Sequence, residues 1–375
     1  MKFIHTADWQ IGMKAVHVGK AGGRVRDERL SAARRVIEEA GNHKADFILL
    51  AGDTFEDNGV ERILVQKTVD ILTGFGGPVF IIPGNHDPLV PGSIWEHPAW
   101  EDQENIHVLT EETPIEIPGG ILYPCPAREK RSGKNPTAWI KNLEGDGIKI
   151  GLAHGTVEGI HQDEQEYPVP REAAALCGLD YLALGHWHST ATYSDSDGTV
   201  RMAYSGTHET TRFGERDSGN ILLVNIVEAG KLPEVTPVKT GGLEWLIFDE
   251  EIRNMGDLGR IKDRIEAIRE PSTTLIDLRL SGLLDGADRE ELLRLNEIVI
   301  SRFLYGRINA SRLRPLPEDE NWLAGLPPGV VREAALQLHA LSNPGFSDKR
   351  PDGATPEVAS RALMELYALV QEVSP

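Results

Sequence analysis

Residues 3–10, Phe-Ile-His-Thr-Ala-Asp-Trp-Gln, form an apolar run that ends in an acidic and an amide side chain. The same arrangement recurs at residues 47–53, where Phe-Ile-Leu-Leu-Ala-Gly-Asp closes an apolar run with a carboxylate. Short apolar runs bounded by turn residues are typical of buried strands. Each segment is therefore predicted to be a strand that delivers a polar side chain at its carboxyl end.

Three more motifs follow apolar runs in the same way. They are Gly-Asn-His-Asp at residues 84–87, His-Gly at 154–155 and Gly-His-Trp-His at 185–188. Each motif by itself is weak, because a turn or a surface loop can contain the same residues. Their joint occurrence, in order and each after an apolar run, indicates one shared site.

The pattern between these motifs predicts an α/β fold. Strands are expected at residues 3–7, 47–51, 79–82, 149–153 and 181–184, and amphipathic helices at 25–42 and 60–75. Strand–helix–strand alternation indicates right-handed crossovers and a largely parallel sheet. Residues 105–126 and 190–238 contain consecutive strands, with a hairpin signal at 194–198. We expect these to be antiparallel parts of a second sheet packed on the first.

The composition changes near residue 241, and we predict three regions. Residues 1–240 form the catalytic α/β domain, 241–315 a small α+β domain, and 316–375 a helical region. In the last region, residues 356–373 contain apolar side chains on one helical face. Such a face suits docking on a coiled coil. It equally suits packing on its own domain.

Composition limits the possible functions. The chain has 375 residues, 40% hydrophobic and 26% charged, as in ordinary globular proteins. No segment approaches the roughly 20 apolar residues of a membrane helix, so we expect no membrane partner. The first residues do not resemble a signal peptide and there are only two cysteines, so a cytoplasmic location is expected. The net charge of −19 means that any nucleic-acid contact depends on local basic patches, metal-mediated contacts or a partner chain.

The polar residues after the strands form a candidate two-metal site. Carboxylate and amide oxygens together with imidazoles suit manganese, iron or zinc. Asp53 is the natural carboxylate to bridge two ions about 3.5–4 Å apart, which would activate a water and clamp a phosphate. The predicted ligands are Asp8, Gln10, Asp53, Asn85, His154, His186 and His188.

Two further residues are predicted to be catalytic. His86 follows the ligand Asn85, and a histidine there can protonate a leaving oxygen. Asp87 is expected to orient the His86 ring. Since His186 and His188 would point to opposite sides of an extended strand, we expect a loop in which each serves a different metal.

These residues resemble the calcineurin-like metallophosphoesterases, and more narrowly the SbcD-like nuclease subunits of DNA-repair complexes. The resemblance rests on the metal motifs and on residues 3–9 (Phe-Ile-His-Thr-Ala-Asp-Trp). Residues 203–207 (Ala-Tyr-Ser-Gly-Thr) and 212–215 (Arg-Phe-Gly-Glu) also resemble that branch. It implies a four-layer αββα metallophosphoesterase sandwich with a small α+β capping domain and a helical C-terminal tail.

The resemblance also implies ligand sets, activity and partners. Asp8, position 10, Asp53 and His188 would hold one manganese ion, and Asp53, Asn85, His154 and His186 the other. His86 matches the catalytic histidine. The implied activity is exonuclease and endonuclease cleavage of DNA phosphodiesters in DNA repair. The implied partners are DNA, an SbcC-like coiled-coil ATPase and a second copy of the chain.

The chain departs from the family pattern at two positions. Gln10 stands where the family has a histidine, and an amide oxygen is a weaker ligand than imidazole for these metals. Glu56 stands where the family usually has a histidine that helps to handle duplex ends. Either change can narrow activity toward single strands or toward another phosphodiester.

Local basic residues are candidates for DNA contact. One cluster, in a loop flanked by glycine and proline, consists of Arg128, Lys130, Arg131 and Lys134. A solvated loop without a ligand is an equally good interpretation. Arg24, Arg26 and Arg29 form a second candidate, although arginines at the start of a helix also serve only to solubilise it.

Two other functions stay open at this point. A metallophosphoesterase acting on small phosphodiesters or phosphoproteins would fit the acidic charge and Gln10. A non-catalytic DNA-binding subunit that has lost a metal would fit Gln10 and Glu56. The remaining ligand positions and His86 argue against the latter.

Overall fold

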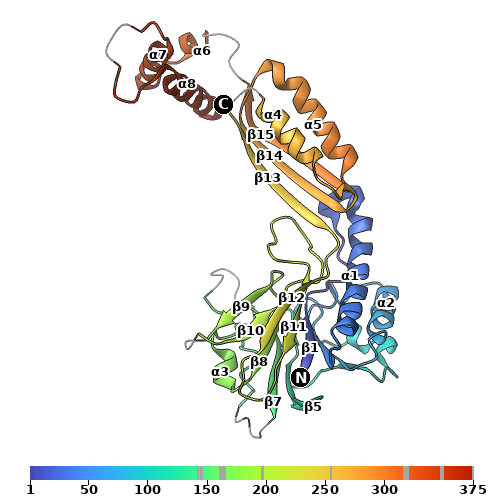
Figure 1. Ribbon diagram of the computed structural model, residues 1–375. Helices are drawn as coiled ribbons and strands as arrows, with labels where there is room; N and C mark the ends of the chain where they lie inside the picture. The colour runs from blue at the N-terminus through green and yellow to red at the C-terminus, as the bar shows by residue number, and fades with distance from the viewer. Residues whose placement is uncertain are drawn as a thin grey trace. The chain divides into compact units, whose positions relative to one another are not determined.

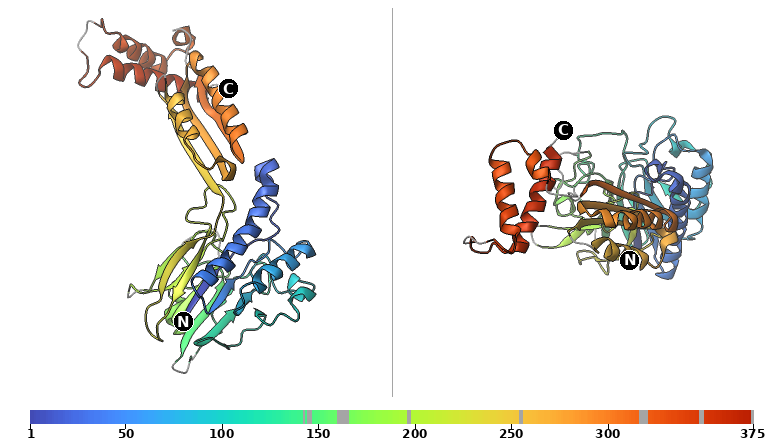
Figure 2. Two further views of the ribbon diagram at one scale, coloured as in Figure 1. Left: turned by 45° about the vertical axis from the view of Figure 1, so that its right-hand side comes forward. Right: turned by 90° about the horizontal axis from the view of Figure 1, so that it is seen from above.

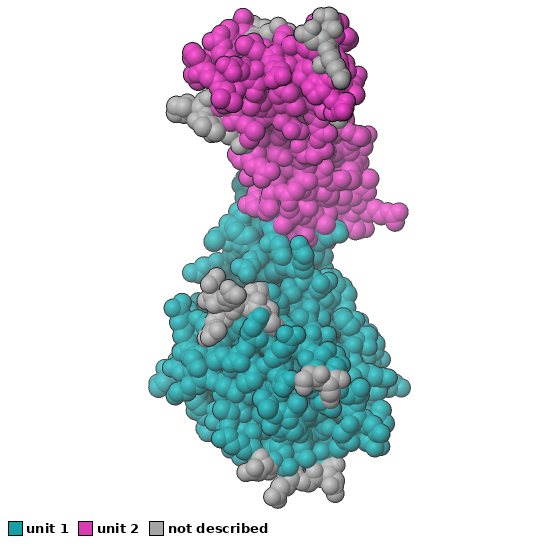
Figure 3. Space-filling model, turned by 90° about the vertical axis from the view of Figure 1, so that its left-hand side faces the viewer, with its two compact units in different colours: residues 1–244 teal, residues 245–375 magenta. Residues whose placement is uncertain are grey.

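The computed structural model describes residues 1–141, 143, 147–159, 166–195, 198–253, 256–315, 321–346 and 350–373. In this part of the chain, two compact units are found, residues 1–244 and 245–375 (Figure 3). The second unit contains both the α+β segment and the C-terminal helices, and the separation of 316–375 as its own region stays a prediction. Residues 196 and 197 of the predicted hairpin turn lie outside the described residues.

The first sheet of unit 1 has, within the described residues, six strands in the order β12-β11-β1-β2-β3-β4. Strands β1 to β4 are parallel, and β11 runs antiparallel to both β1 and β12. The predicted strands at 47–51 and 79–82 are confirmed to the residue. The strands are β1 (Lys2–Thr6), β2 (Phe47–Ala51), β3 (Val79–Ile82), β4 (Ile106–Val108), β11 (Asn220–Asn225) and β12 (Glu234–Lys239).

The second sheet has the order β5-β6-β7-β8-β10-β9, and its four inner strands are parallel. Its strands are β5 (Ile115–Ile117), β6 (Gly120–Cys125), β7 (Ile148–His154), β8 (Tyr181–Gly185), β9 (Ala191–Ser194) and β10 (Val200–Tyr204). The expectation that residues 105–126 and 190–238 belong wholly to the second sheet was wrong. Strands β4, β11 and β12 belong to the first sheet, because strand pairing depends on contacts between residues far apart in sequence.

The two sheets pack face to face and are covered by helices on the outside, which makes four layers (Figure 1). Phe3, Phe47 and Ile150 lie between the sheets. The rings of Phe3 and Phe47 stack on each other, with their centroids 4.9 Å apart. Outside the first sheet, Leu50 packs with Val36 of α1 (Gly22–Asn42) and with residues of α2 (Arg62–Thr73). Outside the second sheet, the short α3 (Ala173–Cys177) packs on β8 and β10. Strands buried on both faces explain why the sequence shows continuous apolar runs instead of alternation.

Unit 2 contains a sheet in the order β13-β14-β15, in which β14 and β15 are parallel. Helices α4 and α5 lie along one face of it (Figure 2). Leu278 of β14 and Leu295 of α5 are buried in the core that they share. The elements are β13 (Glu244–Ile252), α4 (Asp257–Glu266), β14 (Thr274–Leu284), α5 (Arg289–Arg302) and β15 (Tyr305–Pro315).

The C-terminal helices are α6 (Asn321–Gly325), α7 (Val330–Ser342) and α8 (Pro356–Val373). Leu363 of α8 packs with Leu323 and Ala335 of the other two helices, whereas Val358 and Leu369 stay exposed. The apolar face of α8 is therefore used in part within its own unit. No helix among the described residues is long and apolar enough to cross a membrane. Short 3-10 turns occupy Val16–Ala21, Ile94–Glu96, Pro98–Trp100, Pro271–Thr273 and Gly286–Asp288.

Candidate metal centre

The predicted ligands gather at the carboxyl ends of strands from both sheets of unit 1. Asp8, Asp53 and Asn85 follow β1, β2 and β3 of the first sheet, whereas His154 ends β7 and His186 follows β8 of the second. Ligand sites of α/β folds form outside the carboxyl ends of parallel strands. The centre therefore lies where the ends of two packed sheets face each other.

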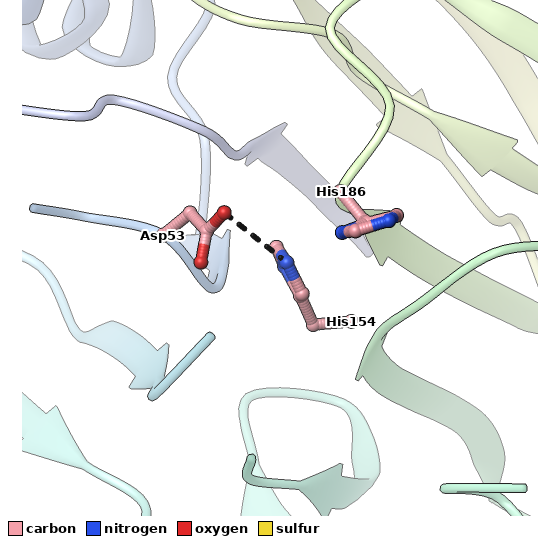
Figure 4. Close-up of side chains that lie close together, drawn as sticks. All are labelled: Asp53, His154 and His186. Carbon is pink, nitrogen blue, oxygen red and sulfur yellow. Dashed lines mark ion pairs between the residues drawn. The ribbon is translucent and has the colours of Figure 1, made fainter. Parts of the chain in front are cut away.

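Asp53, His154 and His186 form the closest group. One ligand atom from each lies within 4.8 Å of those of the other two (Figure 4). His154 Nε2 is 3.4 Å from Asp53 Oδ2. Asn85 Oδ1 lies 2.8 Å from His154 Nε2 and 3.0 Å from His186 Nδ1. The structure thus brings together the four residues that the resemblance assigns to one metal.

The orientation of His154 leaves Nε2 for a ligand. Its Nδ1 lies 2.8 Å from the carbonyl oxygen of Ala51, to which it donates a hydrogen bond. In the neutral ring, Nε2 then carries a lone pair and faces the oxygens of Asn85 and Asp53. Acceptors that face each other at these distances repel unless a proton or a cation lies between them. The donor set therefore fits a divalent metal ion.

Asp8, Gln10 and His188 lie beside this group. The Asp8 carboxylate accepts a hydrogen bond from the backbone N–H of His186, at 3.0 and 3.1 Å from its two oxygens. Gln10 Nε2 is 3.1 Å from His188 Nε2, and His188 Nδ1 is 2.7 Å from Glu215 Oε1. His186 and His188 face different partners, which agrees with the predicted loop.

The pKa values of the acidic and imidazole groups are shifted in opposite directions. Burial raises the pKa of Asp8 to about 6, although His154 and His188 oppose the shift and Asp53 adds to it. For Asp53, burial alone would raise the pKa, but His154 and His86 together hold it well below the ordinary range. Burial alone would lower the pKa of His154, but Asp53, Asp8 and the Ala51 carbonyl together raise it to about 9. Burial and His154 lower the pKa of His186 to about 3. Shifts of both signs in one cluster are typical of functional sites.

Several predicted ligands have backbone angles that non-glycine residues rarely adopt. The φ angles are 53° at Asp8, 40° at Gln10, 51° at Asp53 and 106° at His186. Such conformations cost about 1–3 kcal/mol each and persist where surrounding contacts enforce them. One such contact is the hydrogen bond from Gln10 N to the Asp53 carbonyl, at 2.9 Å.

Arg29 also holds the backbone at Asp8 in its unusual conformation. Its predicted role in DNA phosphate contact was wrong. The side chain is buried, with an exposed fraction of 1% for the residue. Its guanidinium donates to the carbonyls of Asp8 (3.1 Å), Trp9 (2.9 Å) and Glu209 (2.7 Å). It holds the loop that carries Asp8 and Gln10, and sequence reasoning missed this because its partners are distant along the chain.

The contacts of His86 and Asp87 differ from the expectation. His86 Nδ1 lies 3.0 Å from the Glu56 carbonyl, and its backbone N–H donates to Asp53 Oδ1 at 2.8 Å. The Asp87 carboxylate instead accepts from the backbone N–H groups of Phe55 (2.9 Å) and Gly84 (2.6 Å). Asp87 thus joins the two ligand loops and does not orient the His86 ring. Because the Asp87 side chain is fully buried, its carboxylate needs hydrogen-bond donors nearby, and the backbone N–H groups of Phe55 and Gly84 supply them.

The predicted basic cluster is exposed but partly paired with acidic groups. Arg128 lies 3.1 Å from Glu111, and Arg131 lies 3.1 Å from Glu166. Glu166 also accepts a hydrogen bond from Asn85 Nδ2, at 3.4 Å. This contact turns the Asn85 oxygen toward His154 and His186. Lys130 and Lys134 are exposed as well.

The sequence profile of the calcineurin-like phosphoesterases matches residues 1–190 of the 375. An uncharacterized metallophosphoesterase of Bacillus subtilis (strain 168), YhaO, is 25% identical over 240 residues, which cover 60% of this chain. The match spans only 57% of the length of YhaO.

Among solved structures, TT1561 of Thermus thermophilus is 12% identical, with a TM-score of 0.42 over 64% of this chain and 98% of that one. Zn²⁺-bound Vps29 of Entamoeba histolytica is 14% identical, with a TM-score of 0.31 over 64% of this chain and 99% of its own.

Proposed function

Because the chain belongs to the calcineurin-like phosphoesterase family and has a candidate metal site of aspartate and histidine, we propose that it is a two-metal-dependent DNA nuclease. In this proposal it hydrolyses DNA phosphodiester bonds in DNA repair, as an SbcD-like subunit does. The observation that supports it best is the convergence of Asp53, Asn85, His154 and His186 beside Asp8, Gln10 and His188.

In the proposed mechanism, Asp53, Asn85, His154 and His186 would hold one divalent ion, and Asp8, Gln10, Asp53 and His188 would hold the other, with manganese as the expected metal. When bound, such ions would supply an activated water and would stabilise the charge on the phosphate oxygens.

The residues of the chain fix this geometry. Arg29 and the Asp8 carboxylate hold the loops that carry Gln10 and His186. His86 donates Nδ1–H to the Glu56 carbonyl, and in the doubly protonated form of the ring its Nε2–H would pass a proton to the leaving oxygen.

The proposal extends to partners and location. DNA would contact the exposed Lys130 and Lys134, whose charges supplement the metal ions against the net charge of −19. An SbcC-like ATPase coiled coil would contact α8, where Val358 and Leu369 are 55% and 58% exposed. A second copy of the chain is the other expected partner. A cytoplasmic location is part of the same proposal, and the free thiols of Cys125 and Cys177 fit it.

The test is cleavage of single-stranded and duplex DNA by the purified protein with Mn²⁺. Asn85→Ala removes the oxygen between His154 and His186, so it should abolish cleavage. Asn42→Ala, at the end of α1, is the matched control and should cut as the wild type does. A wild type that cuts no form of DNA, even with an ABC-type ATPase partner, would refute the proposal.

A second candidate is hydrolysis of small phosphodiesters or phosphoproteins, which the acidic charge and Gln10 favour. Efficient turnover of bis-p-nitrophenyl phosphate or a cyclic nucleotide, without DNA cleavage, would support it over the nuclease. A third candidate is a non-catalytic DNA-binding subunit. Binding of two manganese ions per chain, together with any phosphodiester turnover, would exclude it.

A further inference from the structure

Glu215 is a buried carboxylate that directly contacts a predicted metal ligand. Its Oε1 lies 2.7 Å from Nδ1 of His188, and its side chain is only 5% exposed. It lies beyond residues 1–190, which match the family profile. Glu215 lies in the loop that follows β10, 27 positions after His188 in the chain.

The Glu215 carboxylate is itself held in place by Thr211. Its Oε2 accepts a hydrogen bond from the backbone N–H of Thr211 at 2.8 Å. Its Oε1 accepts another from the Thr211 hydroxyl. The Arg212 Nε lies 3.5 Å from the same oxygen. A carboxylate fixed by several donors can orient an imidazole more strictly than a free one.

The position of Glu215 decides which nitrogen of His188 can bind a ligand. Because a carboxylate accepts hydrogen bonds, Nδ1 of His188 must carry the proton. Nε2 then presents a lone pair toward the Gln10 amide, 3.1 Å away. A carboxylate behind an imidazole also increases the basicity of the opposite nitrogen.

We infer that Glu215 is a positioning residue that fixes the tautomer and ring orientation of His188 for the metal ion held with Asp8 and Gln10. His154, by contrast, donates its Nδ1–H to a neutral backbone carbonyl. The amide of Gln10 is a weaker ligand than an imidazole. An anionic partner at His188 therefore strengthens the side of the centre that holds the weaker ligand.

The inference rests on the metal centre of the proposed function but not on the substrate. Its test is therefore metal binding. In metal-free protein, ¹⁵N NMR should show His188 with the proton on Nδ1, the signal being assigned with His188→Gln. A neutral ring with its proton on Nε2 alone would overturn the inference, and this result needs no variant of Glu215.

Titration with Mn²⁺ then measures the effect of the carboxylate. Glu215→Gln should lower the affinity of one of two sites by about 10–100-fold and leave the other unchanged, and Glu215→Ala should lower it at least as much. The matched control is Arg212→Gln, which removes the exposed guanidinium 3.5 Å from Glu215 Oε1 but keeps the carboxylate and its Thr211 donors, and should stay within about 3-fold of the wild type. Thermal unfolding identifies any variant that does not fold.

The outcomes separate this inference from the nuclease proposal. Wild-type affinity at both sites in folded Glu215→Gln would overturn the inference and leave the nuclease proposal intact. A loss of equal size in Arg212→Gln would also overturn it, because any change around this loop would then weaken the metal site. A wild type that binds two Mn²⁺ ions but cuts no DNA would refute only the nuclease.

Discussion

His5 should make the stability of unit 1 depend on pH. The ring is fully buried, with Nδ1 2.9 Å from the Tyr181 hydroxyl and Nε2 3.1 Å from the Leu184 carbonyl. The neutral ring satisfies both partners, since Nε2–H donates to the carbonyl and Nδ1 accepts from the hydroxyl. Burial lowers the pKa of His5 from 6.5 to about 3, and the Leu184 carbonyl only partly opposes this shift.

The sign and size of the effect follow from linkage. Above pH 6.5 His5 is neutral in both states, so it adds no dependence on pH. As the pH falls below 6.5, the unfolded chain takes up a proton that the folded chain excludes, and stability is lost until about pH 3. At about 1.4 kcal/mol per pH unit, the loss is about 2 kcal/mol at pH 5 and about 5 kcal/mol in full.

The measurement is urea unfolding of the wild type and His5→Asn between pH 8 and pH 5. Other titrating groups affect both proteins equally, so the difference between the two curves isolates His5. The free energy of unfolding of the wild type should fall about 2 kcal/mol further than that of the variant by pH 5. Parallel curves would refute the reasoning, and so would a protonated His5 ring in NMR spectra of the folded protein at pH 5.

Three further predictions concern the loops of the centre. A methyl group at position 84 would overlap the backbone N and Oδ1 of Asp53. Gly84→Ala should therefore destabilise unit 1 by about 1–3 kcal/mol in urea unfolding. An unchanged unfolding midpoint would contradict this prediction. In Arg29→Lys, a single ammonium replaces the three guanidinium nitrogens that bind the carbonyls of Asp8, Trp9 and Glu209. The variant should lose about 2–4 kcal/mol of stability and bind Mn²⁺ more weakly. Wild-type stability and wild-type Mn²⁺ affinity would show that the guanidinium is dispensable. Gln10→His supplies a stronger ligand beside His188. Titration with Mn²⁺ should show that one site binds about 10-fold more tightly, with the melting temperature unchanged. A variant with the same Mn²⁺ affinity as the wild type would show that position 10 is not a ligand.

Sequence patterns predicted several buried strands and the polar residues that follow them. Residues 47–51 and 79–82 were predicted to the residue, because strands buried on both faces are apolar without interruption. The ligand positions followed from the same pattern, since polar residues directly after parallel strands must gather at one edge. Asp53, Asn85 and His154 are accordingly found together.

The pairing of the strands and the contacts that orient the predicted ligands could be read only from the folded chain. Strand β11 pairs with β1 although they are more than two hundred residues apart in the chain. Arg29 reaches the Glu209 carbonyl across 180 positions, and Glu215 reaches His188 across 27. Asp87 is next to His86 in sequence, but its carboxylate accepts hydrogen bonds from backbone amides and does not orient the His86 ring. Local patterns report whether a residue is buried, but the partner of a buried polar group is set by which distant segments the fold brings together.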